Sequence, residues 1–254
     1  MSNKDPILVA KGLEKRFGGV TAARDISISL YPGETLAVIG SNGAGKTTFV
    51  NMVTGYLTPS AGTIHFKGQD ITGMSPRKTA RIGIRRSFQI SQVFPELTVL
   101  ENVMISDIAA LDGKCGMFAP AITEERMHAA HANLARFGLE GYSESVVSTL
   151  PQGVKKQLDI AMAAVEDPAV ILLDEPTSGV SVDEKIGMMD SVITPLKGED
   201  ATVLFIEHDM DIVSRFASRT VAFYEGTILA DGPTAEVLQN AKVLEYVIGG
   251  VAHA

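Results

Sequence analysis

This sequence of 254 residues has little cysteine and no tryptophan, with one Cys and no Trp. It also lacks long apolar runs. A lone thiol, Cys115, cannot form an internal disulfide, and this favours a reducing compartment. The N-terminus has only a short apolar run at 7–10, and no stretch approaches the roughly 18 consecutive apolar residues of a transmembrane helix. We therefore expect a cytoplasmic chain with neither a signal peptide nor a membrane span.

Positive charge is scarce as well. Lysine and arginine together number 22 against 30 aspartate and glutamate residues, which gives a formal net charge of −8. Nonspecific binding to nucleic acid requires a basic surface, so this balance argues against it as the main task. With 45% hydrophobic residues, the composition is typical of a packed globular chain and excludes a disordered or fibrous one.

Short apolar runs alternate with helical patterns along the chain. Strands are predicted by the apolar runs at 7–10, 26–30, 35–39, 63–66, 170–173 and 202–206, and a final hairpin is expected at 221–232. Helices are expected at about 46–54, 154–165 and 183–196, and after 208. This alternation favours an α/β fold with a largely parallel sheet.

Between about 96 and 150 the pattern becomes helical. Met127, Ala130, Leu134 and Phe137 recur at spacings of three and four, so one apolar stripe of a helix at 124–137 is expected to face a core. We interpret this region as a helical insert that separates two sheet-forming halves.

Residues 40–47 match the pattern G-x-x-x-x-G-K-[ST], between an apolar strand and a helix, which is the context that this phosphate-binding motif requires. Glycines let the backbone approach phosphate oxygens, which need several N–H donors at a helix N-terminus. Lys46 would place its charge on the β- and γ-phosphates, and Thr47 would offer a hydroxyl to Mg²⁺. The motif therefore predicts binding of a nucleoside triphosphate with Mg²⁺.

Three further polar residues follow apolar strands. Asp174 and Glu175 end the run VILLDE, where Asp174 can hold Mg²⁺ through water and Glu175 can polarise an attacking water as a general base. His208 follows the next strand, and a contact with the γ-phosphate is plausible there, although a lone histidine is more often structural.

Taken in order, GSNGAGKTT, SFQISQVFPELTVLENV, VILLDEP and IEHD resemble the motifs of the nucleotide-binding subunit of an ATP-binding cassette (ABC) transporter over the whole chain. The FQ at 88–89, the short insert, EHDMDIV and the ending DGPTAEVLQN…VIGG are similar to ATPases of branched-chain amino-acid, urea and amide uptake systems. The resemblance implies a single α/β domain with a P-loop NTPase (RecA-like) core. Its expected parts are an antiparallel β subdomain at about 6–70, a helical subdomain insert at about 96–150, a core completed by 154–235 and a C-terminal tail at 236–254.

The same resemblance implies ATP and Mg²⁺ as ligands and assigns a role to each motif residue. Phe17 would stack on adenine, Gln89 would contact Mg²⁺ together with Thr47 and Asp174, and Glu175, His208 and Lys46 would be catalytic. The phosphate-binding residues would be Gly40, Ser41, Asn42, Gly43, Ala44, Gly45, Lys46, Thr47 and Thr48.

The chain departs from the family pattern at two places. The signature, normally close to L-S-G-G-Q, is L-P-Q-G-V at 150–154. After the Walker B motif, which is the run VILLDE, the usual S-A-L-D is S-G-V-S at 178–181. In this family each ATP lies between one subunit's phosphate loop and the other's signature, so two copies of this chain would form two sites that both lack the serine. We therefore expect a second, signature-competent ATPase subunit as partner.

The resemblance implies an energy-coupling ATPase of an importer, peripheral on the inner face of the cell membrane. Its partners would be integral membrane permease subunits, docked along the segment from Gln89 through the insert, and indirectly a substrate-binding protein, with no nucleic acid. Alternatives are an exporter ATPase of the lipopolysaccharide-export kind, a soluble cassette acting on ribosomes or DNA, and a regulatory nucleotide-binding partner with little turnover. Intact Glu175 and His208 argue against the last.

Three other signals receive weaker interpretations. His128 and His131 share a helical face but have no third ligand nearby, which favours an exposed polar face over a metal site. The basic segment 75–86 is interpreted as a solvated helix face or a contact with the membrane subunit or acidic lipid. The methionines mostly indicate core packing, with a docking surface as the alternative for Met104 and Met117.

Overall fold

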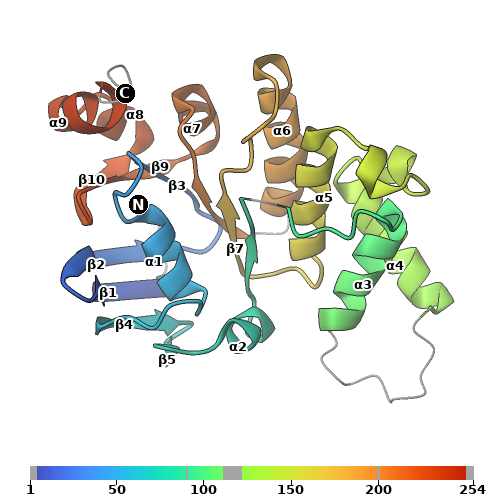
Figure 1. Ribbon diagram of the computed structural model, residues 1–254, viewed down its shortest axis with the longest axis horizontal. Helices are drawn as coiled ribbons and strands as arrows, with labels where there is room; N and C mark the ends of the chain where they lie inside the picture. The colour runs from blue at the N-terminus through green and yellow to red at the C-terminus, as the bar shows by residue number, and fades with distance from the viewer. Residues whose placement is uncertain (1–4, 90, 111–121, 199–200, 250–254) are drawn as a thin grey trace.

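The computed structural model describes residues 5–89, 91–110, 122–198 and 201–249 (Figure 1). Within these residues the strands form a six-stranded sheet and a four-stranded sheet. The larger sheet, in the spatial order β10-β9-β3-β8-β7-β6, comprises β3 (Thr35–Gly40), β6 (Ile84–Ser87), β7 (Val170–Asp174), β8 (Thr202–Ile206), β9 (Arg219–Tyr224) and β10 (Thr227–Pro233). Its strands pair in parallel except for the β9–β10 hairpin, as the alternation of strands and helices predicts.

Strand β3 lies between β8 and β9, and all six of its residues are buried. Its side chains alternate between two cores. Ala37 and Ile39 pack on the face covered by the larger set of helices, and Leu36 and Val38 pack on the face covered by α1 (Lys46–Val53) and the smaller sheet. Full burial of a side chain as large as Leu36, Val38 or Ile39 contributes about 1.5–3 kcal/mol relative to exposure. The strand that delivers the phosphate loop is therefore rigidly held from both sides.

The smaller, antiparallel sheet has the order β2-β1-β4-β5 and lies beside α1 (Figure 1). Its strands are β1 (Leu8–Phe17), β2 (Val20–Leu30), β4 (Ala61–Phe66) and β5 (Gln69–Asp70). The expected strands at 7–10 and 26–30 are the apolar ends of longer elements. They were predicted too short because β1 continues through residues 11–16, where exposed and half-buried charged side chains alternate with the buried Leu13.

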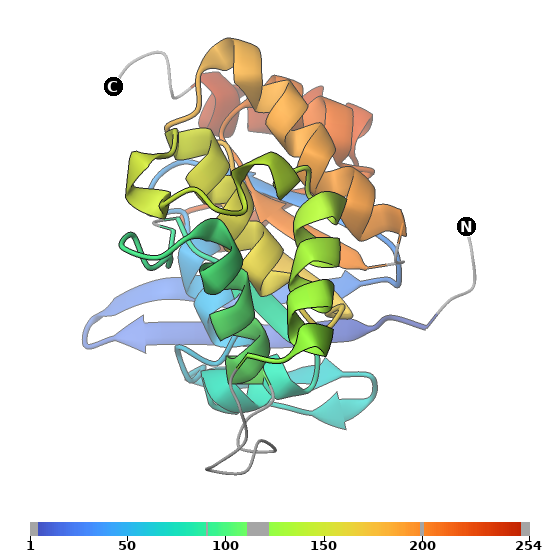
Figure 2. The same cartoon turned by 90° about the vertical axis from the view of Figure 1, so that its right-hand side faces the viewer.

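A group of helices stands at the end of the molecule opposite the antiparallel sheet (Figure 1), and this end faces the viewer in Figure 2. It consists of α3 (Val99–Ala110), α4 (Glu124–Arg136), α5 (Gln152–Ala163) and the short turns η1 (Glu140–Tyr142) and η2 (Val147–Thr149). The predicted stripe is confirmed for Ala130, Leu134 and Phe137, which are buried, and is wrong for Met127, which is 36% exposed. Met104 is buried in the same core, whereas Met117 lies outside the described residues.

The remaining helices complete the covering of the large sheet. They are α2 (Pro76–Arg81), α6 (Val182–Gly198), α7 (Met210–Phe216), α8 (Thr234–Leu238), α9 (Ala241–Val243) and the π-helical turn η3 (Leu244–Ile248). In the part of the chain that the structure describes, none of these elements has the length and hydrophobicity needed to span a bilayer. His128 and His131 are exposed, and no cluster of three or more potential metal-binding side chains occurs among the described residues.

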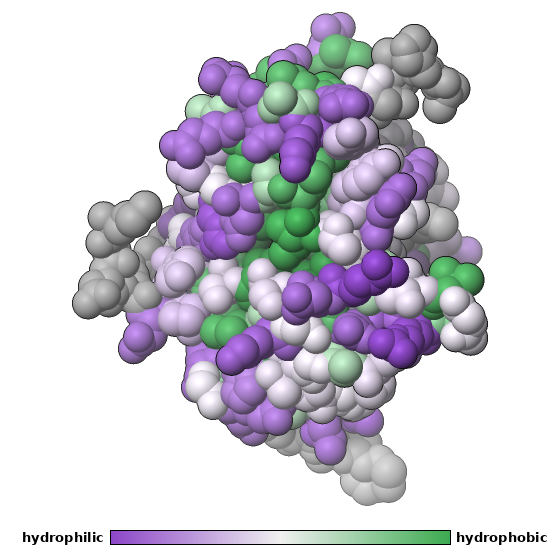
Figure 3. Space-filling model, turned by 90° about the vertical axis from the view of Figure 1, so that its left-hand side faces the viewer, coloured by the Kyte–Doolittle hydropathy of each residue, from purple (hydrophilic) through white to green (hydrophobic). Residues whose placement is uncertain are grey.

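The edge strand β10 leaves an apolar band on one face of the molecule (Figure 3). Its residues Ile228, Leu229 and Ala230 are only partly buried and pack against the two cores. The basic segment at 75–86 is a solvated helix face only in its first part, where Arg77, Lys78 and Arg81 are exposed on helix α2. Helix α2 ends at Arg81, and the segment continues as strand β6, which places Arg86 against the interior.

Candidate phosphate and carboxylate site

The loop between β3 and α1 has a backbone that only glycine fits at two positions. Gly40 and Gly45 have φ of 153° and 101°, and a Cβ at these positions would lie 2.6 Å from the carbonyl oxygen of Phe223 and 2.9 Å from that of Ala22, respectively. Gly45 also precedes the first residue of α1, and no side chain caps the helix there. The first N–H groups of α1 are therefore left for an anion, which fits the phosphates of a nucleotide.

Lys46 reaches back over this loop. Its Nζ donates to the carbonyl oxygens of Gly40 at 2.6 Å and Ser41 at 3.0 Å. Burial lowers the pKa of the Lys46 ammonium, and the nearby carboxylates of Glu175 and Asp174 oppose part of that shift. The lysine thus stands between the phosphate loop and the two predicted acids.

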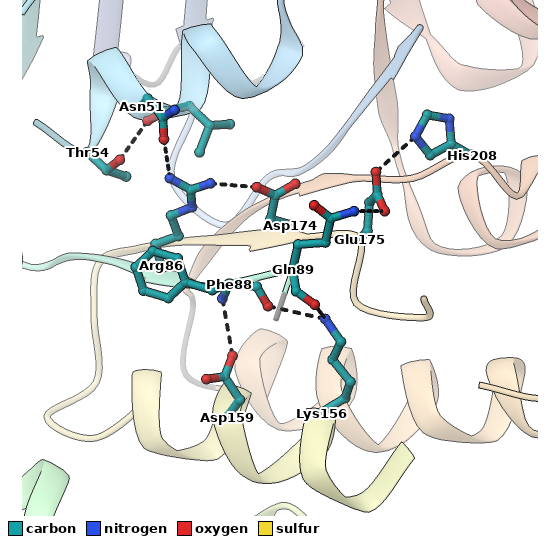
Figure 4. Close-up of polar contacts among 11 residues, drawn as sticks. Asn51, Thr54, Arg86, Phe88, Gln89, Lys156, Asp159, Asp174, Glu175 and His208 are labelled. Carbon is teal, nitrogen blue, oxygen red and sulfur yellow. Dashed lines mark hydrogen bonds and ion pairs between the residues drawn. The ribbon is translucent and has the colours of Figure 1, made fainter. Parts of the chain in front are cut away.

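Gln89, Glu175 and His208 meet at the edge of the sheet where β7 and β8 end (Figure 4). Gln89 Nε2 donates to Glu175 Oε2 at 2.7 Å, and His208 Nε2 lies 3.1 Å from Glu175 Oε1. Both carboxylate oxygens are therefore held, by side chains from two other segments. Glu175 itself has φ of 48°, a left-handed conformation that costs a non-glycine residue on the order of 1–2 kcal/mol and that clusters at functional sites.

Asp174, by contrast, is engaged by a residue that the sequence did not single out for the site. Arg86 Nη2 lies 2.5 Å from Asp174 Oδ2, and Arg86 Nη1 donates to Asn51 Oδ1 at 2.5 Å. The two charged side chains are only 8% and 6% exposed. The run IRRS resembles an exposed basic segment, and its first residue, Ile84, is its one apolar side chain, so no strand was predicted there.

The segment that carries Gln89 is fastened to helix α5 by a second pair of buried charges (Figure 4). Lys156 Nζ donates to the carbonyl oxygens of Phe88 and Gln89, and the Asp159 carboxylate accepts from the N–H groups of Phe88 at 3.2 Å and Gln92 at 2.8 Å. Burial lowers the pKa of Lys156 and raises that of Asp159. The sequence analysis did not identify this pair. A Lys and an Asp three residues apart, beside the apolar Leu158, are the pattern that could have indicated it.

Glu207 supports the turn before His208. Its Oε1 accepts from the N–H of Thr177 at 3.0 Å and from the Thr177 hydroxyl at 2.7 Å, and its Oε2 accepts from the N–H of His208 at 3.1 Å. This buried acid therefore ties the turn after Glu175 to the turn before His208.

The other predicted residues surround this centre more loosely. Phe17 is 49% exposed at the end of β1, and the hairpin that carries it approaches the phosphate loop through Ala22, as the close contact with Gly45 indicates. Asn42 and Thr47 are exposed, which leaves their side chains accessible to a ligand, and Thr48 is partly buried. Asp174, Thr47 and Gln89 offer only oxygen ligands to a metal, and this donor set suits Mg²⁺.

The two departures from the family pattern lie side by side. Pro151 is the cap residue of α5, and a Cβ at Gly153 would lie 3.7 Å from the side chain of Val180. A Cβ at Gly179 would likewise lie 3.4 Å from Gln152 Cγ. A cleft of about 570 Å³ lined by residues that include Glu175, His208 and Val180 adjoins them, so the altered residues border the carboxylate site.

Comparisons with known proteins agree with this geometry. The family model described as ABC transporter matches residues 23–178. The high-affinity branched-chain amino acid transport ATP-binding protein LivG of Escherichia coli (strain K12) is 34% identical over 253 residues, which cover 96% of this chain and 98% of LivG. The protein of the same description named BraF from Pseudomonas aeruginosa is 34% identical over 252 residues, with 96% and 98% covered.

A crystal structure of an ATP-binding cassette of an ABC transporter in its ADP conformation superimposes with a TM-score of 0.84 at 31% identity, covering 96% of this chain and 98% of that one. This likeness confirms the expected P-loop NTPase fold with its antiparallel and helical subdomains. The match extends over nearly the full length, and the phosphate loop leads into a helix start that no side chain caps. The chain belongs to the ABC transporter family, as an ATP-binding cassette that hydrolyses ATP to drive transport by the complex of which it is a component.

Proposed function

We propose that this cassette is the energy-coupling subunit of an importer for branched-chain amino acids or for related small polar solutes such as urea or amides. The support for this substrate class is the description of the full-length relatives LivG and BraF, both named for branched-chain amino acid transport. The solute itself would contact the membrane and binding-protein subunits, so this chain's residues would serve ATP binding and hydrolysis.

In this proposal ATP lies along the loop from Gly40 to Thr48, with adenine against the exposed ring of Phe17. The start of α1, without a side-chain cap, and the Lys46 ammonium would neutralise the phosphates. Thr47, Gln89 and Asp174 would hold Mg²⁺, which supplies neutralisation of charge on the phosphate oxygens when bound. Lys46 would exchange the two loop carbonyls for phosphate oxygens, since its charge is already desolvated there.

The observation that carries the catalytic proposal is the convergence of Gln89 and His208 on the two oxygens of Glu175. A carboxylate fixed at both oxygens, on a backbone that is strained at that residue, has a defined orientation from which to accept a proton from water. His208, which contacts the same carboxylate, would then sense the γ-phosphate. General-base catalysis of this kind contributes about 10²–10⁴-fold to a rate.

We propose further that a second, distinct ATPase subunit completes the site. The signature serine is replaced by Pro151, which has neither a hydroxyl nor a backbone N–H to offer the ATP of a partner. The altered segment 178–181 lies against the same helix start, so both losses fall on one surface. A partner with a complete signature would restore one intact site, whereas a second copy of this chain would restore none.

The membrane subunits would dock on the segment from about Gln89 through the helical region, with the chain peripheral on the inner face of the cell membrane. The contacts of Lys156 and Asp159 with the backbone around Phe88 support this assignment, because they link the docking segment to helix α5, which begins within the signature. A solute-binding protein would act only through the permease.

The experiment is ATP hydrolysis by the complex that co-purifies with this chain, reconstituted in vesicles with its binding protein. Stimulation by a branched-chain amino acid, urea or an amide supports the importer. Stimulation only by a lipid substrate presented from the cytoplasmic side would indicate an exporter and refute it.

A second arm addresses pairing, by comparing the isolated chain with the complex and with Pro151→Ser in each. We expect the isolated chain to be far slower than the complex. Equal rates, unchanged by Pro151→Ser, would refute the unequal pair.

A further inference from the structure

The Asp174 carboxylate, which is proposed to hold Mg²⁺, forms a buried ion pair with Arg86 in this structure. Two guanidinium nitrogens are used, one 2.5 Å from Asp174 Oδ2 and one 2.5 Å from Asn51 Oδ1. Both charged side chains are more than nine-tenths buried. In such a site the interaction of opposite charges is strong and is little screened by salt.

The guanidinium also lies against two aromatic rings. Its carbon is 5.0 Å from the centroid of Phe88 and 5.8 Å from that of Tyr56, and the two rings meet edge to face. Arg86 Nε has no hydrogen-bond partner among the described residues. The polar contacts of the guanidinium are therefore the ion pair with Asp174 and the hydrogen bond to Asn51. A cleft of about 150 Å³, lined in part by Tyr56, Arg86 and Phe88, leaves space beside the guanidinium.

These contacts connect the proposed metal carboxylate to the segment that carries Gln89. Arg86 is paired with Leu172 in the β6–β7 ladder, so its backbone is fixed while its side chain spans from α1 to Asp174. Phe88, two residues later, is the residue whose N–H and carbonyl are both held by helix α5. A displacement of the guanidinium would therefore act first on the ring of Phe88.

We propose that Arg86 is a built-in counter-ion that competes with Mg²⁺ for Asp174, and that its release from Asp174 reports metal–nucleotide occupancy to Phe88 and Gln89. The proposal rests on the assignment of Asp174 to the metal. Without nucleotide, Arg86 neutralises a carboxylate that would otherwise be buried without a partner. With Mg²⁺ and ATP bound, Asp174 changes partner, and the guanidinium keeps its contacts with Asn51 and the aromatic rings.

The test measures equilibrium ATP binding as a function of Mg²⁺ concentration in the full chain carrying Glu175→Gln, which prevents turnover. Arg86→Gln is compared with the parent and with Arg85→Gln, a matched control on the same strand whose partner is Glu166 at the surface, 3.0 Å away. We expect Arg86→Gln to lower the Mg²⁺ concentration at half-saturation by about tenfold, which corresponds to about 1.4 kcal/mol, and Arg85→Gln to leave it unchanged.

An unchanged or higher Mg²⁺ requirement in Arg86→Gln would overturn the proposal, because the arginine would then be neutral for the metal or would order the carboxylate for it. Thermal melting verifies that the variant is folded, and Arg86→Lys, which retains a charge, should fall between the parent and Arg86→Gln. If ATP binds to none of these proteins, with or without Mg²⁺, the proposed function fails instead.

A spectroscopic arm tests the report to Phe88. The chain has no tryptophan, so Phe88→Trp introduces a single reporter beside the guanidinium. Its emission should change when Mg²⁺ is added to the ATP-loaded chain and should not respond in the Arg86→Gln background. The same response in both backgrounds would overturn the role of Arg86 as the link.

Discussion

Lys156 and Asp159 offer the sharpest stability test, because each is buried and each holds the backbone around Phe88. Lys156→Met removes the donor to two carbonyl oxygens and leaves the Asp159 charge without its cation. Leaving a buried polar group without a partner costs about 1–3 kcal/mol, so we expect a loss of about 2–4 kcal/mol in the free energy of unfolding. For a chain of this size, that corresponds to a fall in Tm of roughly 4–16 °C.

The assay is a double-mutant cycle by thermal or denaturant unfolding. Asp159→Asn leaves Lys156 as a buried cation without its acid, and it should cost about 1–2 kcal/mol. The double variant should cost less than the sum of the two single variants, by at least about 0.5 kcal/mol, because each change removes the charge that the other leaves unpaired. Lys155→Met is the matched control. It is half-buried on the same helix with one bond to the Ser148 carbonyl, and it should change stability by less than about 0.5 kcal/mol.

Additive losses in the cycle would refute the reasoning, since they would mean that the two side chains hold the segment independently. A Lys156→Met variant as stable as the control would refute it more simply. In the reconstituted transporter, the same variant should also lower the stimulation of ATP hydrolysis by substrate, because the proposed docking segment is then less firmly linked to α5.

Three further outcomes are expected. Phe17→Ala should weaken ATP binding by about 5–160-fold, as loss of a base–aromatic stack of about 1–3 kcal/mol implies, with Val20→Ala as the control on the same hairpin and direct binding as the measurement. Gly45→Ala should abolish ATP binding in the same assay, because the new Cβ would lie 2.9 Å from the Ala22 carbonyl on a backbone with φ of 101°; binding as tight as in the parent would contradict this. Burial lowers the pKa of Lys156, so between that pKa and the ordinary value of 10.5 the unfolded chain binds more protons and stability rises with pH. Unfolding at alkaline pH should show this rise reduced in Lys156→Met, and an identical slope would contradict it.

The phosphate loop could be predicted to within a residue or so at its boundaries. The strand expected at 35–39 is Thr35–Gly40 and the helix expected at 46–54 is Lys46–Val53, because a buried strand, a glycine turn and a helix start are each recorded in local residue types. The meeting of Gln89, Glu175 and His208 follows from topology as well. Parallel strands place their carboxyl ends at one edge, so residues that follow them are neighbours whatever their separation in the chain.

Arg86 shows what sequence patterns leave out. A charged strand such as IRRS has no apolar alternation, so nothing local separates a buried arginine from a solvated one. Its burial depends on Asp174 and Asn51, which lie far away in the sequence. Strand β1 was predicted too short for a related reason, since only one of its faces is buried. Met127, in contrast, lies at the edge of an apolar stripe whose centre alone contacts the core.

The central claim is that Glu175, held by Gln89 and His208, is the base that makes this cassette an enzyme. Glu175→Gln in the assembled transporter tests it most directly, because the amide keeps the shape of the carboxylate and loses its basicity. The account predicts that kcat falls by about 10²–10⁴-fold while ATP binding changes by less than about threefold, with Glu166→Gln as a surface control that leaves both unchanged. Hydrolysis and transport within about tenfold of the parent would contradict it.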